Sequence, residues 1–263
     1  MTDVHIHFLH GYGGGYTLDF FEGFISKALE KNLNEIYLLE HTHQFTEFKE
    51  MYDAIVEYNE YQSNWIKNRM NGSIENYLSF IETVKEREYP LKVKFGLEVC
   101  YIPETKDILK DILKEYSFDF LTGSVHWING WGFDHPKQKE LWYKVDVNDI
   151  YTKYYEIMCE LCESGLFTGL AHPDNIKCFG FFPTIDMTIM YSRLANSLNR
   201  NRMYAENSGG LRLNYDSSIE LGLNRKLLDI FKENNITILT ASDAHKQSDV
   251  GANIQELELM LKK

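Results

Sequence analysis

The sequence predicts an α/β fold and, within that class, an irregular seven-stranded (β/α)7 barrel of TIM-like type. Short apolar runs alternate with longer amphipathic stretches along the whole chain, a pattern typical of parallel strands covered by helices. That alternation alone would also fit an open, doubly wound sheet. However, every apolar run ends in a polar residue of a kind that binds metals or substrates, and a closed parallel barrel brings all its strand ends to one face. We therefore expect a barrel with one site at the carboxyl ends of its strands.

The predicted elements follow one another without an internal repeat or a linker, so we expect residues 1–263 to form a single domain. The seven predicted strands are residues 2–8, 35–40, 91–99, 118–125, 167–171, 202–206 and 237–241. The predicted helices are residues 18–31, 45–67, 74–87, 105–115, 148–163, 184–198, 224–233 and 250–261. Residues 127–145 are rich in aromatic and charged side chains, and we expect them to form a long loop over the mouth of the barrel.

Composition and charge argue against several classes of protein. The chain has 39 acidic and 27 basic side chains and a net charge of −12, so its average field repels long nucleic acids. No apolar run approaches the ~20 residues that a membrane helix needs, and the N-terminus does not resemble a secretory signal. Four cysteines in 263 residues do not make a disulfide framework. We expect a cytoplasmic protein that binds neither membranes nor long nucleic acids; the sequence indicates no particular oligomeric state.

Histidine is concentrated at the ends of the predicted strands. Seven of the nine histidines lie there, together with two carboxylates. Histidine is the commonest metal ligand, and so many imidazoles at one face predict a multinuclear metal site and a metal-dependent hydrolase. The candidate ligands are His5, His7, His10, His41, Glu98, His126, His172, Asp243 and His245.

Local spacing supports individual ligands in this set. His5 and His7 are two residues apart on a strand, so both imidazoles point to the same side. Asp3 shares that face, where it can orient an imidazole. His172 precedes Pro173, so we expect the backbone of His172 to be extended.

The motifs that carry these residues resemble the polymerase and histidinol phosphatase (PHP) family of metal-dependent phosphoesterases. They are DVHIH followed by HG, then LLEH, GLEV, GSVHWINGWGFDHP, LAHPD and SDAH, and they extend from Asp3 to His245. The resemblance implies a trinuclear site in an irregular (β/α)7 barrel. It implies that His5, His7, Glu98 and Asp243 hold the first metal, that Glu98, His126 and His172 hold the second, and that His10, His41 and His245 hold the third. We thus expect two to three divalent cations, and these ligands suit zinc, iron or manganese.

A narrower resemblance concerns the activity. GSVHWINGWGFD, together with GLEVCYIPE, resembles the branch of the family that hydrolyses histidinol phosphate in histidine biosynthesis, so we expect a phosphatase for this small phosphate ester. Glu98 and Asp243 are the expected catalytic residues, together with Arg212, which aligns with a family arginine that we expect to bind phosphate. The expected substrate contacts also include His43, Trp127, Asp174 and Glu206, with Asp134 as a further acidic candidate and Trp131 as a further aromatic one.

Three other interpretations stay open at this point. The chain could be a phosphoesterase of the same family that acts on another small phosphate ester or on a nucleotide end. It could be a non-catalytic protein whose metals stabilise the barrel or serve a regulatory partner, although structural sites usually close four ligands around one zinc. A metal-dependent amidohydrolase would also gather histidines, but no strand end supplies the lysine-type bridging ligand that such enzymes usually use.

Overall fold

The computed structural model describes residues 1–9, 15–216 and 218–262. Its main element is one sheet of seven parallel strands, which lie in the order β1, β2, β3, β4, β7, β8, β9. The strands are β1 (Thr2–His7), β2 (Glu35–His41), β3 (Lys92–Cys100), β4 (Phe120–Ser124), β7 (Gly169–Leu170), β8 (Tyr204–Ser208) and β9 (Ile238–Ala241). Each falls within or next to a predicted run, so the predicted parallel sheet is confirmed.

The sheet curls into a nearly closed barrel because its first and last strands meet. The backbone N–H of His7 donates to the carbonyl of Ala244 at 2.8 Å, and that of Asp243 donates to the carbonyl of His5 at 3.0 Å. A parallel bridge joins Ile6 to Ala244, just beyond β9. The predicted irregular seven-stranded barrel is therefore confirmed, and all its carboxyl ends meet at one face.

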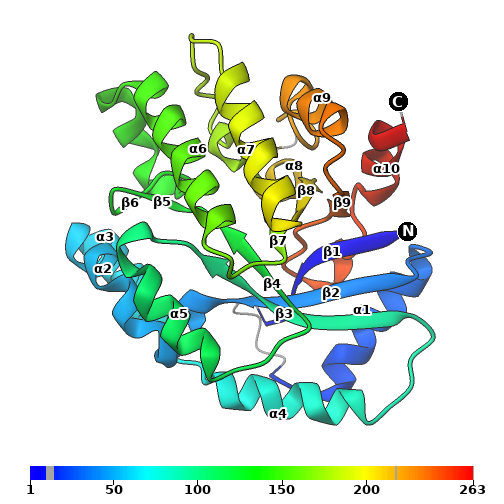
Figure 1. Cartoon of the computed structure of the whole chain (residues 1–263). Coiled ribbons are helices and arrows are strands. Elements are labelled where there is room, and N and C mark those ends of the chain that lie inside the picture. Colours follow the sequence, from blue (N-terminus) through cyan, green and yellow to red (C-terminus); the bar gives the residue numbers. More distant parts are fainter. Residues whose placement is uncertain (10–14, 217, 263) are drawn as a thin grey trace.

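Helices cover the outside of the barrel, and both chain ends lie on the same side of it (Figure 1). The helices are α1 (Leu18–Glu30), α2 (Asp53–Tyr58), α3 (Glu60–Arg69), α4 (Ile74–Lys85), α5 (Lys106–Lys114), α6 (Val147–Glu163), α7 (Thr188–Asn201), α8 (Gly210–Asn214), α9 (Arg225–Glu233) and α10 (Ile254–Lys262). Within the described residues, none of them is long and apolar enough to cross a membrane.

The predicted helix over residues 45–67 is in fact divided. A 3₁₀ segment (Thr46–Tyr52) leads into α2, and Asn59 then starts α3. The Asn59 side chain accepts a hydrogen bond from the backbone N–H of Gln62 at 2.9 Å, which satisfies one of the donors that a helix start leaves unpaired. An asparagine inside an amphipathic stretch was therefore the signal for this boundary.

The barrel interior below the site is filled by a small apolar cluster of Val4, Tyr37, Leu39, Phe120 and Ala241. These residues come from β1, β2, β4 and β9, and side chains from such widely separated strands can meet only inside the barrel. Tyr37 and Leu39 alternate along β2 toward its carboxyl end, so they share one face of the strand. The cluster forms an apolar floor beneath the strand ends.

The segment over the barrel mouth is more regular than the predicted loop. It begins with a hairpin of β5 (Trp127–Ile128) and β6 (Trp131–Gly132), followed by a 3₁₀ segment (Pro136–Lys144). The turn residues Asn129 and Gly130 have φ of 51° and 80°, and Asn-Gly is the favoured sequence for such a two-residue hairpin turn. The dipeptide is visible in the sequence and could have predicted the hairpin.

Candidate metal centre

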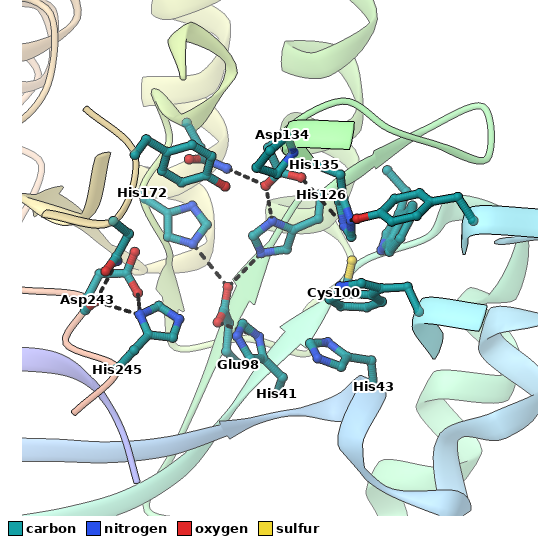
Figure 2. A pocket seen from close by; sticks show the side chains of 17 residues that line it. His41, His43, Glu98, Cys100, His126, Asp134, His135, His172, Asp243 and His245 are labelled. Carbon is teal, nitrogen blue, oxygen red and sulfur yellow. Dashed lines mark hydrogen bonds and ion pairs between the residues drawn. The ribbon is translucent and has the colours of Figure 1, made fainter. Parts of the chain in front are cut away.

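Glu98, at the carboxyl end of β3, lies at the centre of a group of imidazoles (Figure 2). Its Oε1 is 2.9 Å from Nε2 of His126 and 3.0 Å from Nε2 of His172. Its Oε2 is 2.9 Å from Nδ1 of His41, which is paired with Glu98 in the β2–β3 ladder. The two carboxylate oxygens thus face different groups of nitrogens, as a carboxylate that bridges two cations would.

His5 and His7 face the same point, as their spacing on β1 predicts. Their Nε2 atoms are 3.1 Å apart, and each lies 3.3 Å from Oε2 of Glu98. Oδ1 of Asp243 is 3.6 Å from Nε2 of His5 and 3.5 Å from Nε2 of His7. Two neutral imidazole nitrogens repel each other through their lone pairs unless a proton or a metal lies between them. This arrangement therefore fits a cation.

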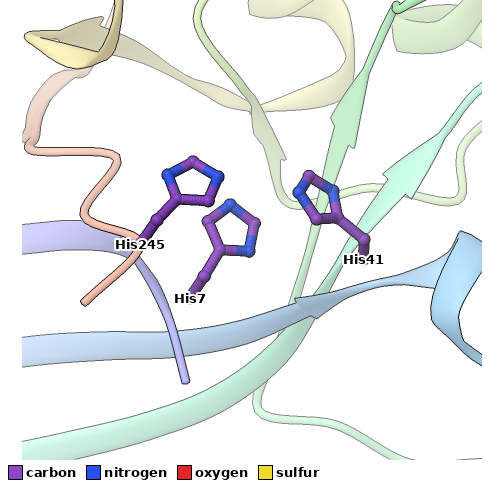
Figure 3. A group of neighbouring side chains, drawn as sticks. All are labelled: His7, His41 and His245. Atoms are coloured by element: carbon purple, nitrogen blue, oxygen red, sulfur yellow. The ribbon is translucent and has the colours of Figure 1, made fainter. Parts of the chain in front are cut away.

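A third group brings His7 to His41 and His245 (Figure 3). The His7 ring stacks on that of His41 at 4.1 Å and on that of His245 at 4.4 Å between centroids, and one ligand atom from each histidine lies within 4.8 Å of the others. The family resemblance instead groups His41 and His245 with His10. His10 lies outside the described residues, so its role stays a prediction.

Four overlapping sets of ligand atoms, each within 4.8 Å, result from this geometry. They draw on eight of the nine predicted ligands, and the ninth is His10. Because the sets share members, the residues fit bound metal better than isolated hydrogen bonds. The sets are His7, His41 and His245; His5, Glu98 and His172; His5, His7 and Asp243; and His41, Glu98 and His126.

Burial keeps two of the imidazoles in the form that binds metals. It lowers the pKa of His41 to about 3 and that of His245 to about 4, and the neighbouring His7 lowers the pKa of His245 further. Burial also lowers the pKa of His5, but the carboxylates of Glu206 and Glu98 outweigh it, so that this pKa is raised. A metal at His5 would therefore compete with a proton, whereas burial favours the neutral form of His41 and His245.

A carboxylate behind the ligands holds His5 in place. Oε1 and Oε2 of Glu206 lie 3.0 and 3.1 Å from Nδ1 of His5. Oε2 also accepts a hydrogen bond from the backbone N–H of His172 at 3.1 Å. The Glu206 side chain is fully buried. In this position the carboxylate can orient His5 and His172 from behind, and its predicted contact with substrate stays a prediction.

A second carboxylate holds the imidazole of His126 in place. Asp134, from the mouth segment, has its Oδ2 2.6 Å from Nδ1 of His126 and accepts a hydrogen bond from Nδ2 of Asn175 at 2.8 Å. The contact leaves Nε2 of His126 directed at Glu98. The mouth segment is thus tied directly to a predicted metal ligand.

The backbone around the ligands differs from two predictions. Asp3 accepts the backbone N–H of Ser242 at 2.8 Å and that of Gly251 at 3.0 Å, so it holds the turn before Asp243 rather than an imidazole. His172 has a φ of 25°, so the predicted extended backbone is wrong. Non-glycine residues adopt positive φ only where the surroundings hold them, and here the His172 N–H is bound to the buried Glu206.

A cavity of about 370 Å³ opens above the metal centre. Of the predicted substrate contacts, His43 and Trp127 line it. The His43 ring lies 4.5 Å from that of His41 and 4.6 Å from that of Trp65. The predictions missed several further residues of the cavity wall, namely Tyr61, Trp65, Asn175, Asn214 and Tyr215.

Two predicted substrate contacts lie outside this cavity. Nε of Arg212 donates to the carbonyl of Ile219 at 3.2 Å, and its Nη1 lies 3.7 Å from a carboxylate oxygen of Glu256. Asp174 is 2.6 Å from Nζ of Lys177 and lines a second small pocket, which His172 and Asp243 also line. The structure therefore does not bring Arg212 to the metal centre, because its guanidinium is bound to partners elsewhere. Asp174 lies beside two of the candidate ligands, in the second pocket.

Residues 3–209 match the family model of the PHP domain. The chain belongs to the PHP family. Two relatives of this PHP chain are a protein of Deinococcus radiodurans named "Probable histidinol-phosphatase", 26% identical over 189 residues, and a histidinol-phosphatase of Bacillus subtilis, 27% identical over 202 residues. The matches cover 68% of this chain in both cases, and 67% and 74% of the two relatives.

Solved structures show the same fold as this PHP chain. Histidinol phosphate phosphatase from Lactococcus lactis, in complex with zinc, L-histidinol and phosphate, superposes with a TM-score of 0.72 at 17% identity, over 99% of this chain and 92% of the other. A protein from Listeria monocytogenes gives a TM-score of 0.73 at 16% identity, over 97% and 99%. These likenesses support the PHP barrel as a whole, including β9, which lies beyond the matched residues.

The PHP motifs also explain why the sequence analysis missed several residues of the cavity wall. The motifs lie at strand ends, whereas Tyr61 and Trp65 come from α3 and Asn214 comes from α8. Tyr61 and Trp65 are four residues apart and therefore share one helix face. That spacing is visible in the sequence, but nothing in it shows that this face turns toward the barrel mouth.

Proposed function

We propose that this PHP protein is a histidinol-phosphatase, which hydrolyses L-histidinol phosphate to L-histidinol and phosphate in histidine biosynthesis. The observation that carries the proposal is a nearly buried carboxylate, Glu98, between imidazoles from four strand ends at the foot of an open cavity. The names of the relatives and the ligands bound to the Lactococcus lactis enzyme support the choice of substrate.

We assign two to three divalent cations, of zinc, iron or manganese, to the centre. Their ligands would be His5, His7, Glu98 and Asp243 for one ion, Glu98, His126 and His172 for another, and His41 and His245 with His7 or His10 for a third. When bound, such cations lower the pKa of water and neutralise charge on the attacking and leaving oxygens. Glu98 and Asp243 would hold the ions in place as the expected catalytic residues.

The cavity wall suggests how the phosphate ester is held. Hydrolysis forms a bond from a water oxygen to phosphorus and breaks the ester P–O bond, and the leaving alkoxide takes up a proton. The described residues of the wall include no lysine or arginine. Negative charge on the phosphoryl oxygens would therefore be met by the cations and by neutral donors such as Tyr215 and Asn175.

We further propose that residues 1–263 act as one domain, in the cytoplasm. The first and last strands close the same barrel, which supports a single domain. The biosynthetic role of the proposed reaction supports the location.

The test is phosphate release from L-histidinol phosphate, from a generic aryl phosphate and from a short oligonucleotide, with metal content measured on the same sample. We expect efficient turnover of histidinol phosphate with two to three metals per chain. Turnover of the aryl phosphate alone would support a phosphoesterase activity but would rule out histidinol phosphate as the substrate. Bound metal without turnover of any ester would favour a non-catalytic protein.

A further inference from the structure

The outer part of the cavity is an aromatic wall formed by Tyr61, Trp65, Trp127 and His135. The His135 ring lies 4.6 Å from that of Trp65 and 4.8 Å from that of Trp127. The hydroxyl of Tyr61 is 3.3 Å from Nδ1 of His135. Two elements distant in sequence, α3 and the mouth segment, therefore build one surface that suits a flat ring.

Asp134 adds an acceptor beside this wall. Its side chain lines the cavity and is 3% exposed (Figure 2). Oδ2 is occupied by His126 and Asn175. Oδ1 is buried and accepts no hydrogen bond from any residue that the structure describes, and Nε2 of His135 is 4.0 Å away from it. A buried carboxylate oxygen without a donor costs free energy, so a donor from a ligand would stabilise it.

The other acidic candidates, Asp174 and Glu206, do not line this cavity. Asp174 is bound to Lys177 and accepts the backbone N–H of Asn224 at 2.7 Å. Glu206 is fully buried behind His5. Among the described residues of the cavity wall, the remaining carboxylates are the metal-ligand candidates Glu98 and Asp243.

We infer that Asp134 Oδ1 and the aromatic wall bind the imidazole ring of the substrate, and that Asp134 thereby determines specificity. This inference rests on the proposed function. An imidazole is flat, stacks on other rings and donates an N–H, and its protonated form also gains from a facing aromatic ring.

The spacing between the two ends of the site fits this assignment. The imidazole of His126 alone separates Oε1 of Glu98 from Oδ2 of Asp134, through contacts of 2.9 and 2.6 Å. In histidinol phosphate, a chain of three carbons joins the ester oxygen to the ring. The phosphate can therefore lie at the metal centre while the ring reaches Asp134.

The first test measures how the Asp134→Asn variant hydrolyses two esters, histidinol phosphate and n-propyl phosphate. The second ester lacks the imidazole ring. Asparagine keeps an oxygen for His126 and Asn175 but loses the charge. We expect the ratio of kcat/KM for histidinol phosphate to kcat/KM for propyl phosphate to fall about tenfold to a hundredfold, mainly through KM. An effect transmitted through His126 alone would lower both values equally.

Trp65→Leu should lower the same ratio. Tyr143→Leu is its matched control, because Tyr143 is an aromatic residue of the mouth segment that is 69% exposed and not part of the cavity wall; it should leave the ratio unchanged. An unchanged ratio in Asp134→Asn, or an equal loss for both esters accompanied by lost metal, would overturn the inference.

The second test separates this inference from the proposed function. Calorimetry measures binding of L-histidinol, of its analogue without the amine and of its analogue without the ring to the metal-loaded protein. We expect Asp134→Asn to weaken the first two about tenfold or more, and the third to bind weakly to both proteins. If the wild-type protein binds histidinol through Asp134 but does not hydrolyse its phosphate, the proposed function fails and the inference stands. Dependence on the amine alone, or no binding of histidinol, overturns the inference.

Discussion

The carboxylate of Glu98 is 1% exposed and yet ionised. Burial by itself would raise its pKa, but the imidazoles around it outweigh that effect. His5, whose own pKa is raised, and the Nε2 atoms of His126 and His172 hold the pKa of Glu98 well below its usual range. A charge in this position is stable only while its partners stay in place. The residue therefore joins the two halves of the ligand set.

Glu98→Gln should lose more than about a hundredfold in turnover and at least one metal per chain, because the amide cannot carry the charge that holds two cations. Circular dichroism should show a largely unchanged fold. Glu75→Gln, on the exposed start of α4, is the control. Near-normal turnover with full metal content would remove Glu98 from the bridging position.

Arg212→Ala should leave the Michaelis constant for histidinol phosphate within about twofold, because exposed ion pairs such as that with Glu256 contribute little. The family alignment predicts the opposite, a raised constant. Steady-state kinetics decide between them: a rise of tenfold or more would show that the guanidinium moves into the cavity when substrate binds.

The grouping of the candidate ligands could be predicted from the sequence, because they lie at the carboxyl ends of strands that meet at one face. The carboxylates that hold the imidazoles of these ligands in place could not be predicted. The sequence predicts Glu206 as a substrate contact at a strand end, and only the three-dimensional structure shows it behind His5. Asp134 is bound to His126 across a hairpin that alternation of strands and helices does not reveal.

At the scale of elements, the short helix α8 packs against the turn that carries Asp243. A Cβ atom at Gly210 would overlap the Asp243 carboxylate, and Nδ2 of Asn214 donates to the Asp243 carbonyl at 2.8 Å. Asp243 itself has a φ of 56°. A helix of five residues is too short for periodicity to reveal, whereas the seven strands and most helices were predicted within a few residues.

Gly210→Ala should lower metal affinity and turnover about tenfold to a hundredfold, because the added methyl group displaces the Asp243 carboxylate from its ligand position. Zinc titration and kinetics measure the effect. Gly209→Ala is a close control, since a Cβ there meets only Asn253, at 3.2 Å or more. Equal behaviour of the two variants would mean that α8 does not position Asp243.

At the scale of the whole molecule, the metal centre gathers buried imidazoles and carboxylates from strands all around the barrel. Without cations, the like charges and facing lone pairs of these groups oppose the compact state. The proposed metals would therefore stabilise the barrel as well as supply chemistry.

Removal of metal by a chelator should lower the melting temperature by several degrees. Ligands that bind only the folded state stabilise it by mass action, by about 2.7 kcal/mol at a hundred times Kd, and about 1 kcal/mol corresponds to ~2–4 °C at this size. Thermal unfolding followed by calorimetry, before and after zinc is restored, measures the shift. A melting temperature that changes neither when the chelator removes metal nor when zinc is restored would contradict metal binding at this centre.

The meeting of β1 with the turn after β9 also has a consequence during protein synthesis. His5 and His7 are translated before Asp243 and His245, which are added more than two hundred residues later. Until residue 245 has emerged, His5 and His7 lack Asp243 and His245 as neighbours, and the barrel remains open along that seam. The full set of candidate metal ligands can therefore assemble only after His245 has been translated.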